Sequence, residues 1–232
     1  MKVKQLLWDS TFFDQKVGEL DIDGSIKNLI SIPGNFDLIY VNNSEDTEIT
    51  LAKYHCSFSE KKVVFEKTDL SKNDEILGNI RSVFDGPYCL PTLYELAEES
   101  GKYSRFHLDP KFSEIYFRKM YHTWIDNSLS GSFADGFLVC EIASEIVGFV
   151  TYRTYIDYAA IGLIAINQMH QGKGIGRQLI FGVENNLIDT GINVLRISTQ
   201  LKNEQACNFY KKLGYSHVET TQIKHFWSDS LQ

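Results

Sequence analysis

Short runs in which apolar residues predominate, separated by polar turn signals, mark the first third of the chain. Lys16–Ile22, Phe36–Val41 and Lys62–Phe65 are β-type runs that predict strands, and Thr47–His55 fits a short helix between them. This stretch alone could bury little apolar surface, so we expect it to pack on the rest of the chain.

A polar segment, Leu70–Asp74, follows and is the best candidate for a domain boundary. We therefore predict a small N-terminal α+β domain over residues 1–75 and a larger domain over residues 76–232. No internal repeat of 20–50 residues is visible, which argues against a solenoid or propeller.

Two helices are predicted after this boundary. Thr92–Glu99 has Thr92 as N-cap and Glu95 three residues later, the spacing of a capping box. Asp109-Pro110 predicts the start of the next helix, because Asp can accept from free N–H groups and Pro has none to lose. Residues at intervals of four predict that this helix packs one face on the core: Phe112, Tyr116, Met120 and Trp124.

Further strands are predicted in the last hundred residues. Phe137–Ile142 and Ile146–Tyr155, separated by three residues, fit a hairpin, and Tyr158–Ile166 fits the next strand. An amphipathic helix over Gln178–Asp189 ends at a glycine suited to its C-terminus, and Val194–Gln200 fits a last buried strand.

Composition and charge exclude several classes of protein. The chain has 232 residues, is 43% hydrophobic and carries a net charge of −7, so it is an ordinary globular chain without the basic face of a nucleic-acid binder. No apolar run reaches the ~18 residues of a membrane helix. The first 15 residues lack the apolar block of a signal peptide, so we expect a cytoplasmic protein with no membrane partner.

The cysteines and histidines give no sign of a metal site. Cys56, Cys89, Cys140 and Cys207 form no C-x-x-C pair, and the six histidines form no H-x-x-x-H pair. We therefore expect no bound metal, and we predict that the cysteines are buried free thiols in a reducing compartment.

A glycine-rich segment between a buried strand and an amphipathic helix is the most informative part of the sequence. Its residues are Gln171, Gly172, Lys173, Gly174, Ile175, Gly176 and Arg177. Glycines let successive N–H groups point into one concavity, and the helix start adds a positive dipole end. Lys173 and Arg177 add positive charge in an otherwise acidic protein, which favours a phosphate-bearing ligand. The spacing fits neither the P-loop nor the dinucleotide pattern, and a purely structural glycine loop is the alternative.

The segment resembles a known family. The pattern Q-x-x-G-x-G from Gln171 to Gly176 is similar to the coenzyme-A-binding loop of the GNAT superfamily of acyl-CoA-dependent N-acyltransferases. Leu163–Ile166 resembles the family's central strand, Val194–Gln200 its next parallel strand, and Asn203–Tyr215 its N-x-x-A-x-x-x-Y-x-x-x-G-F/Y segment. The resemblance covers residues 137–215 and departs at Gln168, where many members have proline.

The resemblance implies an α/β (α+β) fold with a mixed, mostly antiparallel sheet flanked by helices. Only the strands near Ile164 and Ile197 are expected to be parallel. Acetyl-CoA is the implied co-substrate. Its thioester and pantetheine arm would meet the backbone of a bulged, splayed strand, at Ile164, Ala165 and Ile166. Asn203, a natural N-cap, would also contact the coenzyme.

The reaction implied is attack of a primary amine on the acetyl thioester. Tyr210 takes the place of the family's general acid, which protonates the leaving thiolate. A core-edge tyrosine is the structural alternative. The residues leave the general base open among Glu141, Asp157, His107 and a water relay.

The acceptor side is indicated by shorter resemblances. Leu7–Phe13, Ser104–Phe106 and Thr199–Tyr210 are similar to members that acetylate a nucleotide-linked 4-amino-4,6-dideoxy sugar. Arg105, whose fork suits a diphosphate, and His107 are the expected acceptor contacts, unless their loop is merely solvated. A polyamine, peptide N-terminus or antibiotic acceptor remains open, as does a non-catalytic acyl-CoA-binding module. A small molecule is the expected partner, with a homodimer left open.

Overall fold

The computed structural model describes residues 2–22, 29–32, 34–44, 48–74 and 79–231. Most strands join one ten-stranded sheet, and a separate pair is formed by β3 (Leu29–Ile30) and β5 (Thr50–Leu51). In spatial order the large sheet consists of β1 (Lys4–Gln5), β2 (Val17–Ile22), β4 (Leu38–Asn43), β12 (Ser216–Ser228), β6 (Tyr54–Lys67), β11 (Leu195–Gln200), β10 (Ala159–Ile166), β9 (Glu145–Thr154), β8 (Gly136–Ile142) and β7 (Ile80–Ser82). The α-helices are α1 (Leu7–Phe13), α2 (Leu90–Ser100), α3 (Arg105–Leu108), α4 (Glu114–Leu129), α5 (Ile175–Asp189) and α6 (Glu204–Lys212).

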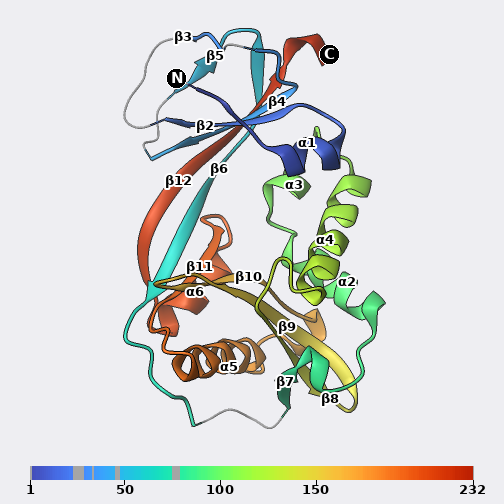
Figure 1. The fold of residues 1–232 in the computed structure, drawn as a ribbon, viewed down its shortest axis with the longest axis vertical. Coiled ribbons are helices and arrows are strands. Elements are labelled where there is room, and N and C mark those ends of the chain that lie inside the picture. The colour runs from blue at the N-terminus through green and yellow to red at the C-terminus, as the bar shows by residue number, and fades with distance from the viewer. Residues whose placement is uncertain (1, 23–28, 33, 45–47, 75–78, 232) are drawn as a thin grey trace.

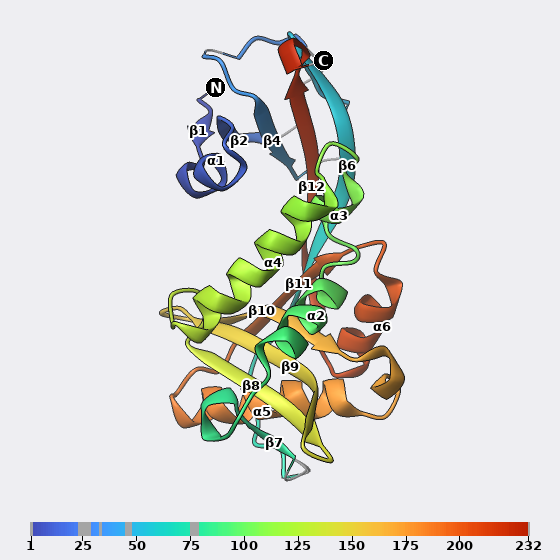
Figure 2. The same ribbon diagram turned by 90° about the vertical axis from the view of Figure 1, so that its right-hand side faces the viewer.

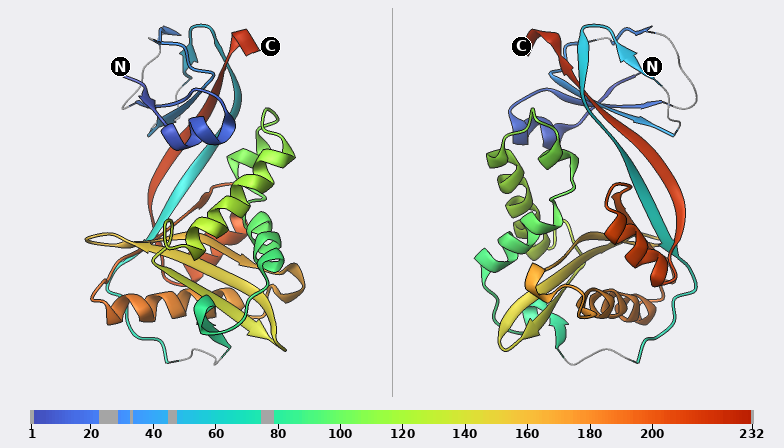
Figure 3. Two further views of the ribbon diagram at one scale, coloured as in Figure 1. Left: turned by 45° about the vertical axis from the view of Figure 1, so that its right-hand side comes forward. Right: turned by 180° about the vertical axis from the view of Figure 1, so that it is seen from behind.

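Two long strands join the ends of the elongated molecule. Figure 1 shows β6 and β12 running from the N-terminal strands at the top to the helices and strands at the bottom. At the top β12 pairs with β4, and lower down β6 pairs with β11, both antiparallel. Both views in Figure 3 show the same ribbon as the link between the two ends.

The lower sheet is covered on both faces. Along β8, Leu138 and Cys140 belong to the core beneath α5, whereas Phe137 and Val139 belong to the core beneath α2 and α4. Because successive strand side chains point to opposite faces, α5 covers one face and the α2–α4 pair the other (Figure 2). Each fully buried Leu, Ile or Phe contributes about 1.5–3 kcal/mol to these cores.

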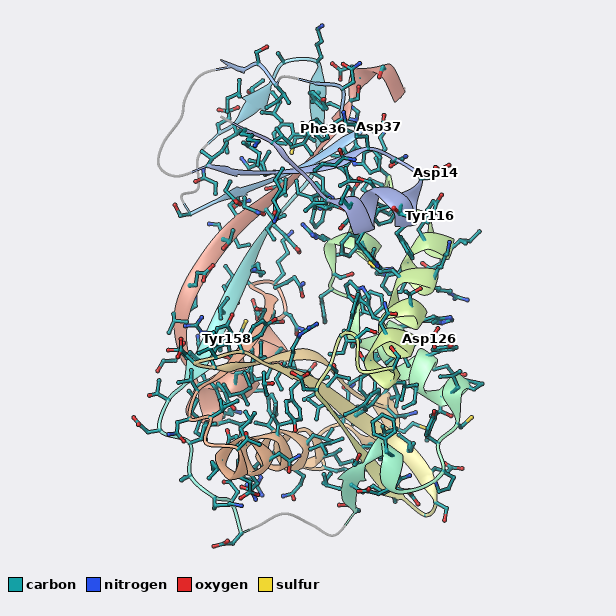
Figure 4. The ribbon with its side chains drawn as sticks, in the orientation of Figure 1. Asp14, Phe36, Asp37, Tyr116, Asp126 and Tyr158 are labelled. Atoms are coloured by element: carbon teal, nitrogen blue, oxygen red, sulfur yellow. The ribbon has the colours of Figure 1, made fainter. Side chains whose placement is uncertain are left out.

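The N-terminal end docks on α4 through aromatic rings. Phe13 of α1 lies 5.6 Å from the ring of Tyr116, and the Lys119 ammonium lies 5.2 Å from the ring of Phe12. Figure 4 shows Tyr116 on α4 next to α1. Such ring pairs are worth about 0.5–1.5 kcal/mol beyond their buried area.

The mixed, mostly antiparallel sheet flanked by helices confirms the predicted fold class. β10 and β11 are parallel, with Ile161 opposite Ile197. The prediction that no other strands are parallel is wrong, because β2 pairs with β4 in parallel, Val17 opposite Leu38, as does β3 with β5. The connection over residues 23–37 is long enough to bring the chain back to the same end of the sheet, as a parallel pair requires.

The division at residue 75 stays a prediction. A single sheet runs through both predicted domains, because β6 from the first lies between β11 and β12 from the second. The C-terminal strand β12 in turn pairs with β4 of the first predicted domain. Folding of the N-terminal end therefore depends on strands from both predicted domains.

Two predictions in the first half of the chain are wrong. No helix lies in the described part of Thr47–His55, where β5 and the start of β6 are found; residues 45–47 lie outside the described residues. The capping box at Thr92 is also wrong, because α2 already begins at Leu90, with Cys89 at the N-cap and a proline in the first turn. The fixed φ of that proline suits the first turn, so the helix starts earlier.

The start predicted at Asp109 is wrong for a different reason. α4 begins at Glu114, with the Ser113 hydroxyl accepting from the Tyr116 N–H at 3.3 Å. The fully buried Asp109 carboxylate is engaged elsewhere: Ser57 Oγ (3.0 Å), His225 Nδ1 (2.7 Å) and Trp227 Nε1 (3.2 Å) all contact it. It ties the turn before α4 to β6 and β12 rather than capping the helix.

The apolar face of α4 is shifted from the predicted one. Phe112 precedes the helix and Tyr116 is exposed, although Met120 is fully buried. The buried residues are Phe117, Met120, Tyr121, Ile125 and Ser128. A strict interval of four drifts around a helix of 3.6 residues per turn, which explains the shift.

The predicted hairpin is confirmed. β8 and β9 are joined through Ala143 and Ser144, which have φ values of 50° and 65°, as a type I′ turn requires. The prediction for the cysteines holds in part. All four are free thiols, but Cys56 and Cys89 are exposed, and only Cys140 and Cys207 are buried.

Candidate active site

A cleft of about 1050 Å³ is lined by residues from both ends of the molecule. Strands β2, β4, β6 and β12 contribute one side, and the segment from α2 to α4 contributes another. The remaining lining comes from β10, β11, the glycine loop with the start of α5, and α6. Most of the residues that the sequence analysis predicted for one site therefore line a single cavity.

Strand β10 is bulged and separates from β11. Its pairing with β9 shifts register between Ile161 and Ile164, and the Leu163 N–H donates to Thr151 Oγ1 at 2.9 Å. Pairing with β11 ends at Ile161, and residues Ile164, Ala165 and Ile166 line the cleft beyond that point. The resulting V leaves backbone groups of β10 facing the cleft instead of a partner strand.

The glycine loop begins after a 3-10 turn at Gln168–His170. Gly172 and Gly174 have φ values of +75° and +83°, and Gly174 is the N-cap of α5. Gln171 Nε2 donates to the Ile166 carbonyl at 3.1 Å, which fixes the loop against β10. The free N–H groups at the start of a 15-residue helix then meet the end of β10, an arrangement suited to an anion.

Not every residue of the loop faces the cleft. Gln171, Gly172, Gly174, Ile175, Gly176 and Arg177 line it, whereas Lys173 does not. A Cβ on Gly176 would lie 3.2 Å from the Phe209 ring and 3.3 Å from Ile166, so this glycine allows α5 to approach α6 and β10. The backbone, rather than Lys173, forms the wall of the cleft here.

Helix α6 brings two predicted residues to the cleft. Asn203 caps the helix, with its Oδ1 accepting from the Ala206 N–H at 3.2 Å, and its side chain lines the cleft. Tyr210 lines the cleft while 4% exposed, with its ring 5.8 Å from that of Phe65. Burial raises the pKa of Tyr210, so its hydroxyl keeps the proton that a general acid needs.

The structure separates the two residues predicted to contact an acceptor. Arg105, at the start of α3, lines the cleft with its guanidinium 4.1 Å from the ring centroid of Tyr40. His107, two residues later, does not line it; its ring lies 4.7 Å from that of Phe117, and its Nδ1 lies 3.6 Å from Glu114 Oε2. The short helix α3 turns these two side chains in different directions, so only Arg105 can contact a molecule in the cleft.

The other candidates for the base also lie outside the cleft. Glu141 pairs with Arg81 at 2.7 Å, and Asp157 is exposed in the turn between β9 and β10. Sequence reasoning missed Glu60 on β6, which lines the cleft and is 5% exposed. Burial raises the pKa of Glu60 to about 7, although Arg105 and Lys202 oppose the rise.

The N-terminal end of the cleft is rich in carboxylates. Glu19 and Asp21 of β2 both accept from Asn42 Nδ2, at 3.0 and 2.9 Å, and Glu219 of β12 lies in the same lining. Glu99 of α2 pairs with Lys102 at 2.5 Å. The positive groups on this side are Lys62, Lys102 and Arg105.

Neither a metal centre nor a membrane span is found in the part of the chain described. Its His, Cys, Asp and Glu residues form no group of three or more that could hold a metal ion. No described helix is both long and apolar enough to cross a bilayer.

Known proteins share the sequence pattern and the fold. The sequence profile described as "Acetyltransferase (GNAT) family" matches residues 92–215. The spore coat polysaccharide biosynthesis protein SpsD of Bacillus subtilis is 25% identical over 133 residues, covering 57% of this chain and 46% of SpsD. The dTDP-fucosamine acetyltransferase of Escherichia coli is 32% identical over 134 residues, covering 57% of this chain and 56% of that enzyme.

One solved structure extends the likeness beyond the profile. A putative GNAT acetyltransferase of Novosphingobium aromaticivorans superposes with a TM-score of 0.58 at 14% identity, covering 84% of this chain and 76% of the other. The chain matches only about half the length of the two curated relatives. The profile, however, covers more than half of this chain and includes β10, the glycine loop and α6. The chain therefore belongs to the GNAT acetyltransferase family, whose members use acetyl-CoA as acyl donor.

Proposed function

We propose that the protein transfers the acetyl group of acetyl-CoA to the amino group of a nucleotide-linked amino sugar, of the 4-amino-4,6-dideoxy type. The observation that carries the proposal is one cleft lined both by the glycine loop and by Arg105. The loop and the α5 start suit the diphosphate of coenzyme A, and Arg105 suits the diphosphate of an acceptor. The relative named dTDP-fucosamine acetyltransferase supports this acceptor class.

On the donor side, backbone N–H groups 171–177 would bind the diphosphate, and β10 would bind the pantetheine arm. The separation of β10 from β11 leaves Ile164–Ile166 free to meet the thioester. A backbone N–H aimed at the developing oxyanion is worth about 10²–10³ in kcat. Tyr210 would then protonate the leaving thiolate, since burial keeps its hydroxyl protonated.

On the acceptor side, the planar guanidinium of Arg105 would pair with two phosphate oxygens. Its cation–π contact with the Tyr40 ring, 4.1 Å from the guanidinium carbon to the centroid, restrains the side chain, so less side-chain entropy is lost on binding. Tyr103, Phe106 and Trp124 line the same side and offer rings for a base or sugar.

The test is an acetyl-transfer assay with free-thiol detection. The panel contains dTDP- and UDP-linked amino sugars, spermidine and a peptide with a free N-terminus. We expect turnover with a dTDP-linked 4-amino-4,6-dideoxy sugar at a kcat/KM at least about 10-fold above every other amine, because one hydrogen bond to a charged phosphate is worth about 1.5–3 kcal/mol and about 1.4 kcal/mol is tenfold. Turnover of spermidine or the peptide alone would reject the nucleotide-sugar acceptor.

A second acceptor class is favoured by one observation. Glu19 and Asp21 at the N-terminal end of the cleft, with Glu219 further along β12 opposite Val64, give the lining a negative character that suits an acceptor with several amino groups. Such an acceptor would bind more weakly as salt rises, because exposed charges are screened. In the same panel this class predicts turnover of spermidine, with a KM that rises between 50 and 500 mM salt.

A further inference from the structure

Glu60 differs from the other carboxylates of the cleft. Glu19 and Asp21 accept from Asn42, Glu99 pairs with Lys102, and Glu219 accepts from the Thr221 hydroxyl. For Glu60, no hydrogen bond is among the causes that set the pKa of the carboxyl; these are burial and the charges of Arg105 and Lys202. The residue is 5% exposed, and the loss of hydration outweighs the attraction of the two cations.

The strand register puts Glu60 at the open end of the V between β10 and β11. On β6, Lys62 lies opposite Gln200, the last residue of β11, and the Leu201 N–H donates to the Lys61 carbonyl at 2.8 Å. Glu60 therefore lies just beyond the end of β11, opposite Ile223 of β12. β10 and β11 separate toward this same end, where Ile164–Ile166 and Tyr210 also line the cleft.

We propose that Glu60 is the general base that takes a proton from the acceptor ammonium before it attacks the thioester. The inference rests on the proposed transfer of acetyl to an amine, but not on which amine is the acceptor. A carboxylate on the acceptor side of the V reaches the incoming nitrogen from the side opposite the thioester, as this step requires. The base thus comes from a strand of the N-terminal part, which residues 92–215 of the family profile do not include.

The protons balance with Glu60 and Tyr210 in these roles. The carboxylate of Glu60 takes one proton from R–NH₃⁺ and releases it to solvent after product leaves. The neutral amine forms the new C–N bond, and the C–S bond breaks as the tetrahedral intermediate collapses. Tyr210 gives its proton to the thiolate, and the proton lost by the nitrogen restores the phenol.

The charges that face Glu60 come from three elements. Arg105 approaches from α3 and Lys202 from the turn after β11, and the neutral phenol of Tyr121 approaches from α4. Lys62 lies two residues away on the same strand and also lines the cleft. Burial outweighs the two nearest cations and holds the pKa of Glu60 at about 7, near the working pH of a base.

The test compares Glu60→Gln with the matched variant Glu66→Gln. Glu66 is on the same strand, pairs with Arg196 at 2.7 Å and does not line the cleft. With the dTDP-linked amino sugar, or with spermidine if only spermidine turns over, E60Q is expected to lower kcat about 10²–10³-fold. In E60Q, the fall of kcat/KM on the acidic side of pH 7 should vanish, and the Kd for acetyl-CoA should stay within 2-fold of the wild type. The kcat and pH profile of E66Q should equal those of the wild type. A raised KM with unchanged kcat, or an acidic limb that survives in E60Q, would overturn the proposal.

A second measurement needs no acceptor. Between pH 4.5 and 7, a carboxyl with a raised pKa keeps its proton in the folded state but has lost it in the unfolded state. The free energy of unfolding therefore falls as pH rises through that window. The melting temperature of E60Q should therefore exceed that of the wild type at pH 8, and the two should agree at pH 4.5. An equal difference at both pH values would remove Glu60 as the base. If no amine of the panel turns over, the proposed function fails, while this measurement still shows whether the Glu60 carboxyl has the raised pKa that the role of base needs.

Discussion

The two sides of the cleft are built in different ways. The proposed coenzyme side is made mainly of backbone from one continuous stretch, β10, the glycine loop and the start of α5. The proposed acceptor side is made of side chains from β2, β6, α3 and β12, which are far apart in the sequence. The first side can serve every member of a family with one co-substrate, whereas the second can change with the acceptor.

This difference separates what substitutions should do. On the coenzyme side, a substitution should affect activity mainly where it changes the backbone conformation or removes the proton donor for the thiolate. On the acceptor side, each side chain contributes a contact of its own. Substitutions on the coenzyme side should therefore have the largest effects and those on the acceptor side smaller ones. A side chain that does not line the cleft should have the smallest effect.

Tyr210→Phe is expected to have the largest effect among them, because it removes the acid while leaving the ring in its core. We expect kcat to fall about 10²–10³-fold, with the Kd for acetyl-CoA unchanged. Steady-state kinetics and calorimetry measure both, and Tyr155→Phe, on an exposed turn, is the matched control. Unchanged turnover would return Tyr210 to a purely structural role.

Gly174→Ala tests the backbone cradle. Gly174 caps the start of α5 at φ +83°, and Gly191 follows the end of the same helix at φ +81°; a Cβ on either would meet nothing within 4 Å. Both substitutions should cost about 1–2 kcal/mol of stability through the left-handed backbone alone. Only Gly174→Ala should weaken acetyl-CoA binding, by about 10-fold in calorimetry. Equal affinities in the two variants would contradict a cradle at residues 171–177.

Local patterns were sufficient to predict which residues of the proposed coenzyme side line one cleft. The bulged strand, the loop and the α6 cap lie within one stretch, and the residues predicted there, Lys173 apart, line one cleft. Glycine spacing and helix caps depend on backbone geometry that a sequence displays directly. Lys173 does not line the cleft, and its charge alone could not show where its side chain lies; its contact with the coenzyme stays a prediction.

The acceptor side could not be predicted in the same way. Glu60 belongs to a 14-residue strand of which the pattern predicted only Lys62–Phe65, because polar residues follow each other where β6 crosses from one end of the molecule to the other. Asp109 and His225, 116 positions apart, meet at 2.7 Å in a buried pair. The pair forms only through tertiary contact, which no local pattern contains. Burial lowers the pKa of His225 to about 4.

Arg105→Lys tests the acceptor side with a charge-conserving change. Lysine keeps the charge but loses the guanidinium contact with the Tyr40 ring and the bidentate contact proposed with a diphosphate. The KM for a nucleotide sugar should rise about 5-fold, with the KM for acetyl-CoA constant. Arg118→Lys, on an exposed face of α4, should change neither. A rise in the KM for acetyl-CoA instead would place Arg105 on the coenzyme side.

Lys173→Ala should have the smallest effect, although it removes a positive charge from the glycine loop itself. Lys173 is exposed and does not line the cleft, so it can act on a diphosphate only through solvent. Interactions of that kind are worth about 0.2–1 kcal/mol and are screened by salt. The Kd for acetyl-CoA should therefore rise less than about 3-fold at 50 mM salt and be unchanged at 500 mM. A 10-fold loss that persists at high salt would mean that a side chain, and not the backbone alone, holds the coenzyme, and the contrast between the two sides of the cleft would weaken.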